Sequence, residues 1–348
     1  MVKRLKGDEF VSQASIYGGL AYCSAVSAPH IQGLAGQTQE VLRLYDEMFS
    51  LHKLDKGRIV HAFAALDYSA EADDFFSAWN AWLPAGEEPA LTAIRVGLEA
   101  GKLISLQLYV AQEGEVVRVD LPQSRGKLVK HNKVAYFGGQ TAAADSPNEQ
   151  ARSIRRSYDE LLAACNLKKE NILNANSYLR SVSMRNEEYA ADWTGWTCAG
   201  HKPAGTLVQA APLEKGRDVT IEFMFADSTQ VEDIGRIDAG DTICRAVKHN
   251  GVVYFTGHVC AKPEKITLYE QSAALFVRIE ELMEGFGLKR ENLIICNPYI
   301  RDIDKTAEFM QAWGEWVLQD ACPSLSIRGA RMIEEAYTLE MSFLIACG

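Results

Sequence analysis

Two glutamates stand on strand-like segments where a carboxyl group could work as an acid or a base. Glu222 lies in a Thr220-x-Glu222 pair and Glu340 in a Thr338-x-Glu340 pair, each within a run that alternates as half-buried strands do. Burial can raise the pKa of such a carboxyl group and let it transfer protons near neutral pH. We therefore predict Glu222 and Glu340 as catalytic residues, with a structural carboxylate as the alternative at each position.

A second polar pattern, Asn-x-Tyr-[Leu/Ile]-Arg, occurs twice. Because alternate side chains of a strand share one face, each copy presents an amide, a phenol and a guanidinium together. Such a ladder is either the outer surface of the strand or the wall of a ligand site. We predict that it binds substrate, through Asn176, Tyr178, Arg180, Asn297, Tyr299 and Arg301.

Two glycines end the strand-like runs 134–139 and 252–257. A glycine at such a point lets a ligand approach the backbone N–H groups, so we predict Gly139 and Gly257 in substrate binding. His258 follows directly. An imidazole with an ordinary pKa of about 6.5 can move protons, so His258 is the third predicted catalytic residue, with a satisfied strand-end histidine as the alternative.

The elements that position these residues repeat three times. The pattern [Asp/Glu]-[Phe/Tyr]-x-x-x-Trp-x-x-Trp places aromatic side chains on one face of a helix, where they would pack it against a sheet. Three matching helices are expected to begin near three glutamines. The tryptophans are Trp79, Trp82, Trp193, Trp196, Trp313 and Trp316, and the glutamines are Gln37, Gln150 and Gln271.

Each repeat has the order strand–helix–strand–helix–strand over about 115 residues, which is enough for an α+β unit with two helices on a small mixed sheet. We place the units at 1–115, 116–235 and 236–348, the first being the most degenerate. Three such sheets in one chain are expected to bury their free faces together around a pseudo-threefold axis. This predicts a monomer that folds as an intrachain pseudo-trimeric barrel.

These motifs resemble the RidA (YjgF) family of imine and enamine deaminases. Unit 2 carries most of the resemblance, in the segments 136–140, Glu149-Gln150 and Pro203-Ala204-Gly205-Thr206, followed by Glu222 nineteen residues after Pro203. The resemblance implies a chorismate-mutase-like trimeric barrel with small-molecule clefts between units. It also implies an arginine that grips a substrate carboxylate and a water molecule that attacks the imine carbon.

The sequence departs from this family at the arginine, whose place is taken by Leu91, Gly205 and Leu325 in the three units. None of these side chains can bind a carboxylate. Gln107 replaces the strand glutamate in unit 1, and tryptophan replaces the family's asparagine in the second helix of every unit. The leading hypothesis is a RidA-like enzyme that hydrolyses, deaminates or tautomerises an imine or enamine-type metabolite by a modified site.

Two other classes of function stay open. One is a non-catalytic ligand-binding or scaffold protein, and the other is a ring-opening hydrolase or chorismatase-like lyase on a related fold. A formal charge of −10 argues against a nucleic-acid partner, and no apolar run is long enough to cross a membrane. Cofactor motifs and metal-ligand spacings of the eight cysteines are absent, so we expect no cofactor, no metal and a cytoplasmic protein.

Overall fold

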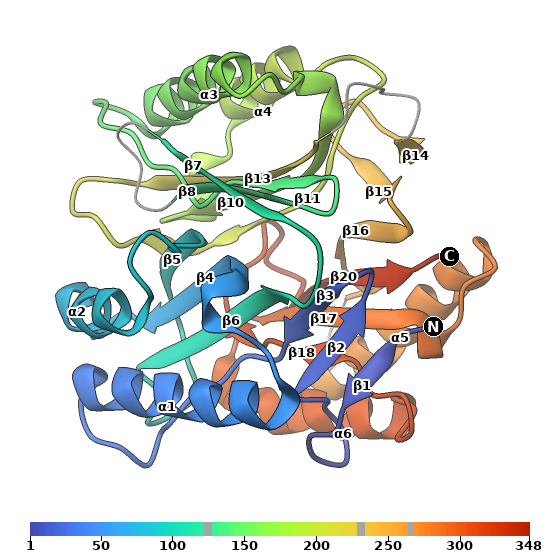
Figure 1. Ribbon diagram of the computed structural model, residues 1–348. Coiled ribbons are helices and arrows are strands. Elements are labelled where there is room, and N and C mark those ends of the chain that lie inside the picture. Colours follow the sequence, from blue (N-terminus) through green and yellow to red (C-terminus); the bar gives the residue numbers. More distant parts are fainter. Residues whose placement is uncertain (122–126, 228–233, 264–266) are drawn as a thin grey trace.

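Three mixed sheets form the protein in a computed structural model that describes residues 1–121, 127–227, 234–263 and 267–348 (Figure 1). The first sheet contains β1 (Lys3–Leu5), β2 (Ala14–Tyr17), β3 (Leu20–Cys23), β4 (Ile59–Asp67), β5 (Ala90–Val96), β6 (Ile104–Ala111) and β12 (Ala211–Pro212). The second contains β7 (Val116–Asp120), β8 (Lys127–His131), β9 (Val134–Tyr136), β10 (Ile172–Leu179), β11 (Ala204–Gln209) and β13 (Val219–Ala226). The third contains β14 (Gly235–Ala239), β15 (Cys244–His249), β16 (Val252–His258), β17 (Leu293–Ile300), β18 (Ser324–Leu325), β19 (Arg328–Gly329) and β20 (Leu339–Ala346).

The sheets share one topology, because in each the last long strand lies between the first hairpin and the middle strand. Their orders are β1-β2-β3-β6-β4-β5-β12, β11-β10-β13-β9-β8-β7 and β14-β15-β16-β20-β17-β18, with β19 also paired to β17. The pairs β4–β5, β10–β11 and β17–β18 are parallel and the hairpins are antiparallel. The predicted α+β class and its tandem repeat are confirmed.

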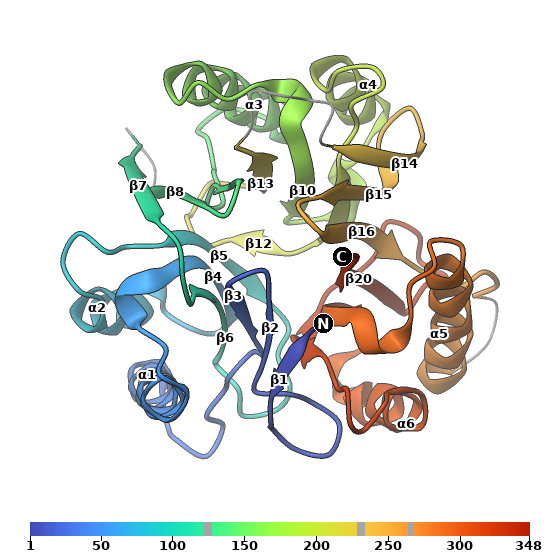
Figure 2. The ribbon, with the colours of Figure 1, turned by 45° about the vertical axis from the view of Figure 1, so that its right-hand side comes forward.

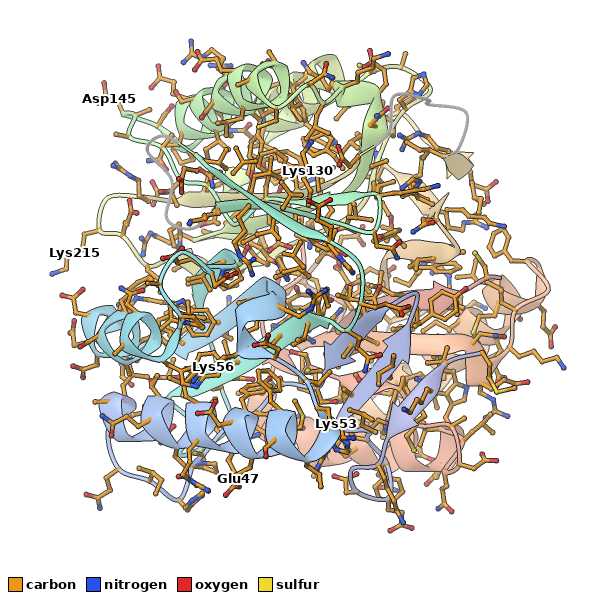
Figure 3. The ribbon with its side chains drawn as sticks, in the orientation of Figure 1. Glu47, Lys53, Lys56, Lys130, Asp145 and Lys215 are labelled. Atoms are coloured by element: carbon orange, nitrogen blue, oxygen red, sulfur yellow. The ribbon has the colours of Figure 1, made fainter. Side chains whose placement is uncertain are left out.

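Two helices accompany each sheet on the outside of the molecule, and the sheets face a common centre (Figure 2). The helices are α1 (Leu34–His52), α2 (Ala72–Trp82), α3 (Pro147–Ala164), α4 (Glu187–Trp196), α5 (Leu268–Glu284) and α6 (Thr306–Trp316). No helix in the described ranges is long and apolar enough to span a bilayer. Exposed charged side chains such as Glu47, Lys53 and Lys215 project from the periphery (Figure 3).

The repeated glutamine has one structural task in all three units. In unit 1 the Gln37 Nε2 donates to the carbonyl oxygens of Ile31 and Gly101, while its Oε1 accepts from the Leu103 N–H at 2.8 Å. Gln150 and Gln271 make the corresponding bonds in units 2 and 3. Each glutamine thus satisfies backbone groups that precede the last strand of its sheet, which explains why this residue recurs.

The tryptophan helices pack against the sheets and also join the units. Trp193 stacks on Phe223 of β13 with ring centroids 6.2 Å apart, and its Nε1 donates to the Thr242 carbonyl of unit 3 at 2.8 Å. Trp313 makes the corresponding bond to the carbonyl of Phe10 in unit 1 at 3.0 Å. The sequence repeat therefore has a packing role, as expected for aromatic side chains that cover a sheet.

Buried side chains from all three units meet at the centre. One cluster joins Phe63 of β4, Tyr178 of β10 and Tyr299 of β17 with apolar residues that follow β5, β11 and β19. Tyr178 and Tyr299 are 1% and 2% exposed. The inner faces of the sheets are therefore buried against one another, and the polar residues found there need partners.

Candidate functional site

A cleft of about 180 Å³ lies between units 2 and 3, and we call it the 2–3 cleft. Unit 2 contributes its tryptophan helix and the start of β11, and unit 3 contributes the end of β16, β20 and the β14–β15 turn. The lining residues are Ala175, Ser177, Arg185, Tyr189, Ala190, Trp193, Gly205, Thr206, Leu207, Thr242, Ile243, Thr256, Gly257, Ile333 and Glu340. The cleft is thus an apolar and aromatic pocket with one carboxyl group, three threonines and one guanidinium.

Glu340 supplies the titratable group of the 2–3 cleft. Burial raises the pKa of its carboxyl group to about 8, and the neighbouring Thr206 hydroxyl offsets only part of that shift. A Cβ atom on Gly257 would lie 1.9 Å from the Glu340 Oε1, so the carboxyl group occupies space that only glycine leaves open. The sequence therefore needs Gly257 to seat Glu340, a role different from the predicted backbone contact with substrate.

The position of the missing arginine cannot hold a side chain in this backbone. A Cβ atom on Gly205 would lie 2.1 Å from the carbonyl oxygen of Ala175 on the adjacent strand. The Gly205 N–H donates instead to the Thr256 Oγ1 at 3.2 Å, across the boundary between the units. The close packing of β11 against β10 and β16 therefore leaves no room for an arginine side chain at this position of unit 2.

Arg185 brings a cation to the 2–3 cleft from a different element. It follows the 3-10 turn Val182–Met184 and precedes α4, and it lies close enough to lower the pKa of the Tyr189 phenol, which burial itself raises. No ion pair involves Arg185 in the described part of the chain. Sequence reasoning missed this residue because it lies outside the motifs that align the units, and its place beside the tryptophan helix was the available signal.

A second cavity, of about 40 Å³, lies where the three sheets meet, and we call it the axial chamber. It holds about three water molecules at most, since each needs some 10–15 Å³. Polar residues from every unit line it, among them His61, Gln107, Tyr109, Asn176, Tyr178, Glu222, Asn297, Tyr299 and Arg328. The chamber is too small for a metabolite, but its polar lining is unusual for a buried centre.

Glu222 faces this axial chamber and not the 2–3 cleft. Its Oε1 lies 3.7 Å from the His61 Nε2 of unit 1 and accepts from the Asn176 Nδ2 at 3.3 Å. Burial by itself would raise the pKa of Glu222, but His61, with help from Thr92 and Asn176, holds it below its usual value. Glu222 is thus a buried carboxyl group whose lowered pKa favours the ionised form and whose neighbours come from two units.

The two glutamates are not structural equivalents, which corrects an expectation from the Thr-x-Glu repeat. Asn176 pairs with Glu222, whereas its repeat counterpart Asn297 pairs with Ser342. Glu340 lies opposite Tyr299, in the place that Thr220 takes opposite Tyr178. Strand pairing therefore aligns Glu340 with Thr220, two residues before Glu222. A shift of two residues leaves a side chain on the same face of the strand.

The Asn-x-Tyr-x-Arg ladders do not form single ligand walls. The asparagines and tyrosines line the axial chamber, but Arg180 lies at an exposed strand end, where its Nε donates to the Asp218 carboxylate at 2.9 Å. Arg301 donates to the backbone carbonyl of Glu335 at a strand end as well. Neither arginine lines the 2–3 cleft or the axial chamber, because each directly follows the end of its strand, beyond the region where the sheets meet.

Two further predicted residues lie outside the 2–3 cleft. His258 packs beside Phe255 and Phe343, and burial, with smaller effects of Arg278 and Arg245, lowers its pKa to about 3, so the ring is neutral at physiological pH. Gly139 lies between units 1 and 2, where a Cβ atom would come 2.8 Å from the Thr220 Cγ2. Gly139 therefore allows the two units to pack closely and does not leave its backbone open to a ligand.

Close contacts also join the units at the other two boundaries, and an open polar cavity of about 460 Å³ lies between units 1 and 2. Between units 1 and 2, a Cβ atom on Gly138 would lie 2.3 Å from the Leu91 carbonyl oxygen. Between units 3 and 1, the Ser324 hydroxyl donates to the Tyr22 carbonyl at 2.6 Å, and the Ser24 hydroxyl accepts from the Leu325 N–H at 2.9 Å. Of the three boundaries, the 2–3 boundary thus combines a cavity with a buried carboxyl group.

Comparison with known proteins identifies the family. The family model described as Endoribonuclease L-PSP matches residues 124–226 and 235–347, which is well over half of the chain. The chain belongs to this family. The RidA (YjgF) family with tandem units is thereby confirmed, and the matches fall in the second and third repeats. Among the described residues, no group of three His, Cys, Asp or Glu side chains is placed to hold a metal ion.

Single-unit relatives support this assignment, and a larger protein shares the fold. A RutC family protein of Haemophilus influenzae is 26% identical over 99 residues, covering 28% of this chain and 85% of that protein. The RutC family protein YoaB of Escherichia coli K12 is 26% identical over 115 residues, covering 32% of this chain and 97% of its own. A chorismatase crystal structure covers 83% of this chain and 93% of its own, with a TM-score of 0.59 and 11% identity, which shows a shared fold.

Proposed function

We propose that this RidA-family chain is a small-molecule enzyme that hydrolyses, deaminates or tautomerises an imine or enamine in the 2–3 cleft. The observation that carries the proposal is Glu340, a carboxyl group with a pKa of about 8 in an apolar cleft of about 180 Å³. A general acid is most effective when its pKa lies near the working pH. At neutral pH most of the Glu340 population is protonated and ready to donate.

The proposed reaction uses both protonation states of Glu340. The carboxylic acid gives its proton to the enamine carbon or the imine nitrogen, which leaves an iminium carbon and a carboxylate. Water adds to that carbon while the Glu340 carboxylate takes the proton that water loses. Glu340 then gives this proton to the nitrogen. As the C–N bond breaks, its carboxylate takes the hydroxyl proton, so ammonia and a carbonyl compound leave and the carboxylic acid is restored. The cleft contributes mainly orientation, since imines hydrolyse readily.

Arg185 and the aromatic wall would orient the substrate. An arginine without an ion-pair partner can bind an anionic group, although at a position different from the family's arginine. Tyr189 and Trp193 give an apolar surface for the body of the substrate, and the Thr206 hydroxyl is a hydrogen-bond partner of Glu340. This arrangement favours a substrate with an anionic group at one end and the reacting nitrogen at the other.

A direct assay follows release of ammonia and keto acid from freshly generated imines of several parent amino acids, with buffer alone to measure spontaneous hydrolysis. We expect acceleration by the wild-type protein for at least one parent, and a higher KM with Arg185→Met. The exposed Arg156→Met is the matched control, with unchanged kinetics. No acceleration over buffer for any member of the panel would reject the proposal and favour a binding role.

A chorismatase-type reaction is the second candidate, because the similarity to a chorismatase spans most of the chain. It shares the requirement for a proton donor, which Glu340 would supply. Chorismate therefore belongs in the same panel, with its consumption followed by chromatography. Turnover of chorismate without release of ammonia from any imine would replace the deaminase proposal by this one.

We further propose that the three units, with boundaries near 115 and 235, close into a pseudo-threefold barrel within one chain. Backbone hydrogen bonds at each boundary support closure, from Gly139 N–H to Leu91, from Cys244 N–H to Pro203 and from Ala25 N–H to Leu325. Sedimentation equilibrium is expected to give a monomer mass near 38.5 kDa. A particle of three times that mass would contradict closure, because it would mean that chains assemble as separate units do.

A further inference from the structure

Arg328 is a buried cation at the centre of the molecule. Its side chain enters the axial chamber from β19, and the residue is only 3% exposed. Its Nη2 donates to the Gln107 Oε1 at 2.9 Å and its Nη1 to the Tyr299 hydroxyl at 3.2 Å. The guanidinium also stacks over the Phe63 ring, 3.8 Å from the centroid. All of these partners are neutral, while a guanidinium is always charged.

Among the residues that line the chamber, Glu222 is the carboxylate, and its printed contacts are with residues other than Arg328. Its Oε1 lies 3.7 Å from the His61 Nε2 of unit 1 and accepts from the Asn176 Nδ2 of unit 2. No carboxylate lies within 4 Å of the Arg328 nitrogens anywhere in the described ranges of the chain. A buried charge without a counter-charge is strongly unfavourable, so the Arg328 guanidinium lacks an anionic partner at contact distance.

The chamber has room for a small counter-ion beside Arg328. Its volume of about 40 Å³ exceeds that of one water molecule but excludes amino acids, nucleotides and most metabolites. The side chains of Asn297 and Tyr109 line the same space and can donate hydrogen bonds. The Asn297 Oδ1 accepts from the Gln107 Nε2 at 3.2 Å, which leaves its amide hydrogens available to the chamber.

We propose that the axial chamber binds one small monovalent anion, no larger than chloride, bromide or formate, with Arg328 as its counter-charge. The anion balances the positive charge of Arg328 in a site to which all three units contribute residues. It therefore stabilises the folded chain by joining residues of units 1 and 3 at the axis. This proposal rests on the axial chamber and is independent of any reaction in the 2–3 cleft.

The test is thermal unfolding of the full chain in potassium chloride, bromide or formate, with potassium gluconate at equal ionic strength as the reference. Gluconate is too large for the chamber and so corrects for screening. We expect a rise in Tm with the small anions that grows with the logarithm of their concentration and reaches about 2 °C near ten times Kd. Arg328→Met should abolish the rise, and the exposed Arg156→Met should keep it.

Bromide supplies a second readout that needs no variant. Crystals grown in bromide are expected to show one anomalous peak beside the Arg328 guanidinium, displaced by formate but not by gluconate. Equal Tm values in all four salts, or a chamber without the peak, would overturn the proposal. A salt bridge between Arg328 and Glu222 in such crystals would overturn it as well, because the charge would then be met within the protein.

Discussion

Replacing Glu340 by glutamine is expected to lower kcat by at least about 100-fold and to make the protein more stable at alkaline pH. The first effect follows because glutamine keeps the shape of the side chain but cannot donate and recover a proton. The second follows from the raised pKa, since Glu340 ionises near pH 8 in the folded chain and near 4.5 when unfolded. The two effects have one cause, burial of the carboxyl group, and are measured separately.

The sign of the stability effect is fixed by proton binding. Between about pH 4.5 and pH 8 the folded chain holds a proton on Glu340 that the unfolded chain has released, so the free energy of unfolding falls as the pH rises. The full effect is about 5 kcal/mol, an upper bound obtained from the difference between the two pKa values. Glu340→Gln removes this titration, and the gap between variant and wild type should widen up to about pH 8.

Urea unfolding from pH 5 to pH 9 measures the effect, with the exposed Glu334→Gln as the control, for which we expect no such trend. A variant that is equally stable at every pH would show that Glu340 is not a buried acid. A variant that is more stable at pH 9 yet retains full turnover would support burial of the Glu340 carboxyl group but reject Glu340 as the catalytic residue. The stability and activity readouts thus separate the two statements.

The repeat could be predicted from the sequence because packing and backbone satisfaction recur in every unit. The two strands predicted to carry the Asn-x-Tyr-[Leu/Ile]-Arg pattern are observed as Ile172–Leu179 and Leu293–Ile300, each ending one residue before the arginine. The helices begin three residues before Gln37, Gln150 and Gln271. In every unit a glutamine bonds the same loop and tryptophans cover the same sheet face. The regular spacing of these residues can therefore be recognised in the sequence alone.

The site could not be predicted to the same extent, because it lies where the repeat fails. A slip of two residues in a strand keeps the side-chain face, so the pattern Thr-x-Glu could not separate Glu222 in the chamber from Glu340 in the cleft. Arg185 follows a 3-10 turn and Arg328 lies on a short strand, and neither residue belongs to a motif that the units share. Their importance depends on which surfaces meet between units, and a single sequence does not encode that juxtaposition in any local pattern.

The His61–Glu222 pair is expected to show the largest coupling in the axial chamber. Either single replacement, Glu222→Leu or His61→Phe, should lower the free energy of unfolding, because one partner stays buried without the other. Losses of about 3–5 kcal/mol are typical when a buried pair is broken. The double variant should regain most of the loss, since well-packed apolar residues often replace a buried pair without cost. Urea unfolding of the four proteins gives the coupling by a double-mutant cycle.

The pH dependence and the activity of the same variants decide what Glu222 does. Because the pKa of Glu222 lies below its usual value, its contribution to stability is present above pH 4.5 and is lost as the pH falls through the folded pKa. The exposed Arg43–Glu47 pair is the control, and Glu47→Ala should change stability little. Additive single losses would disprove the pairing. If the folded double variant keeps turnover, Glu222 is a structural carboxylate, whereas a loss of turnover in that variant restores it as a catalytic residue.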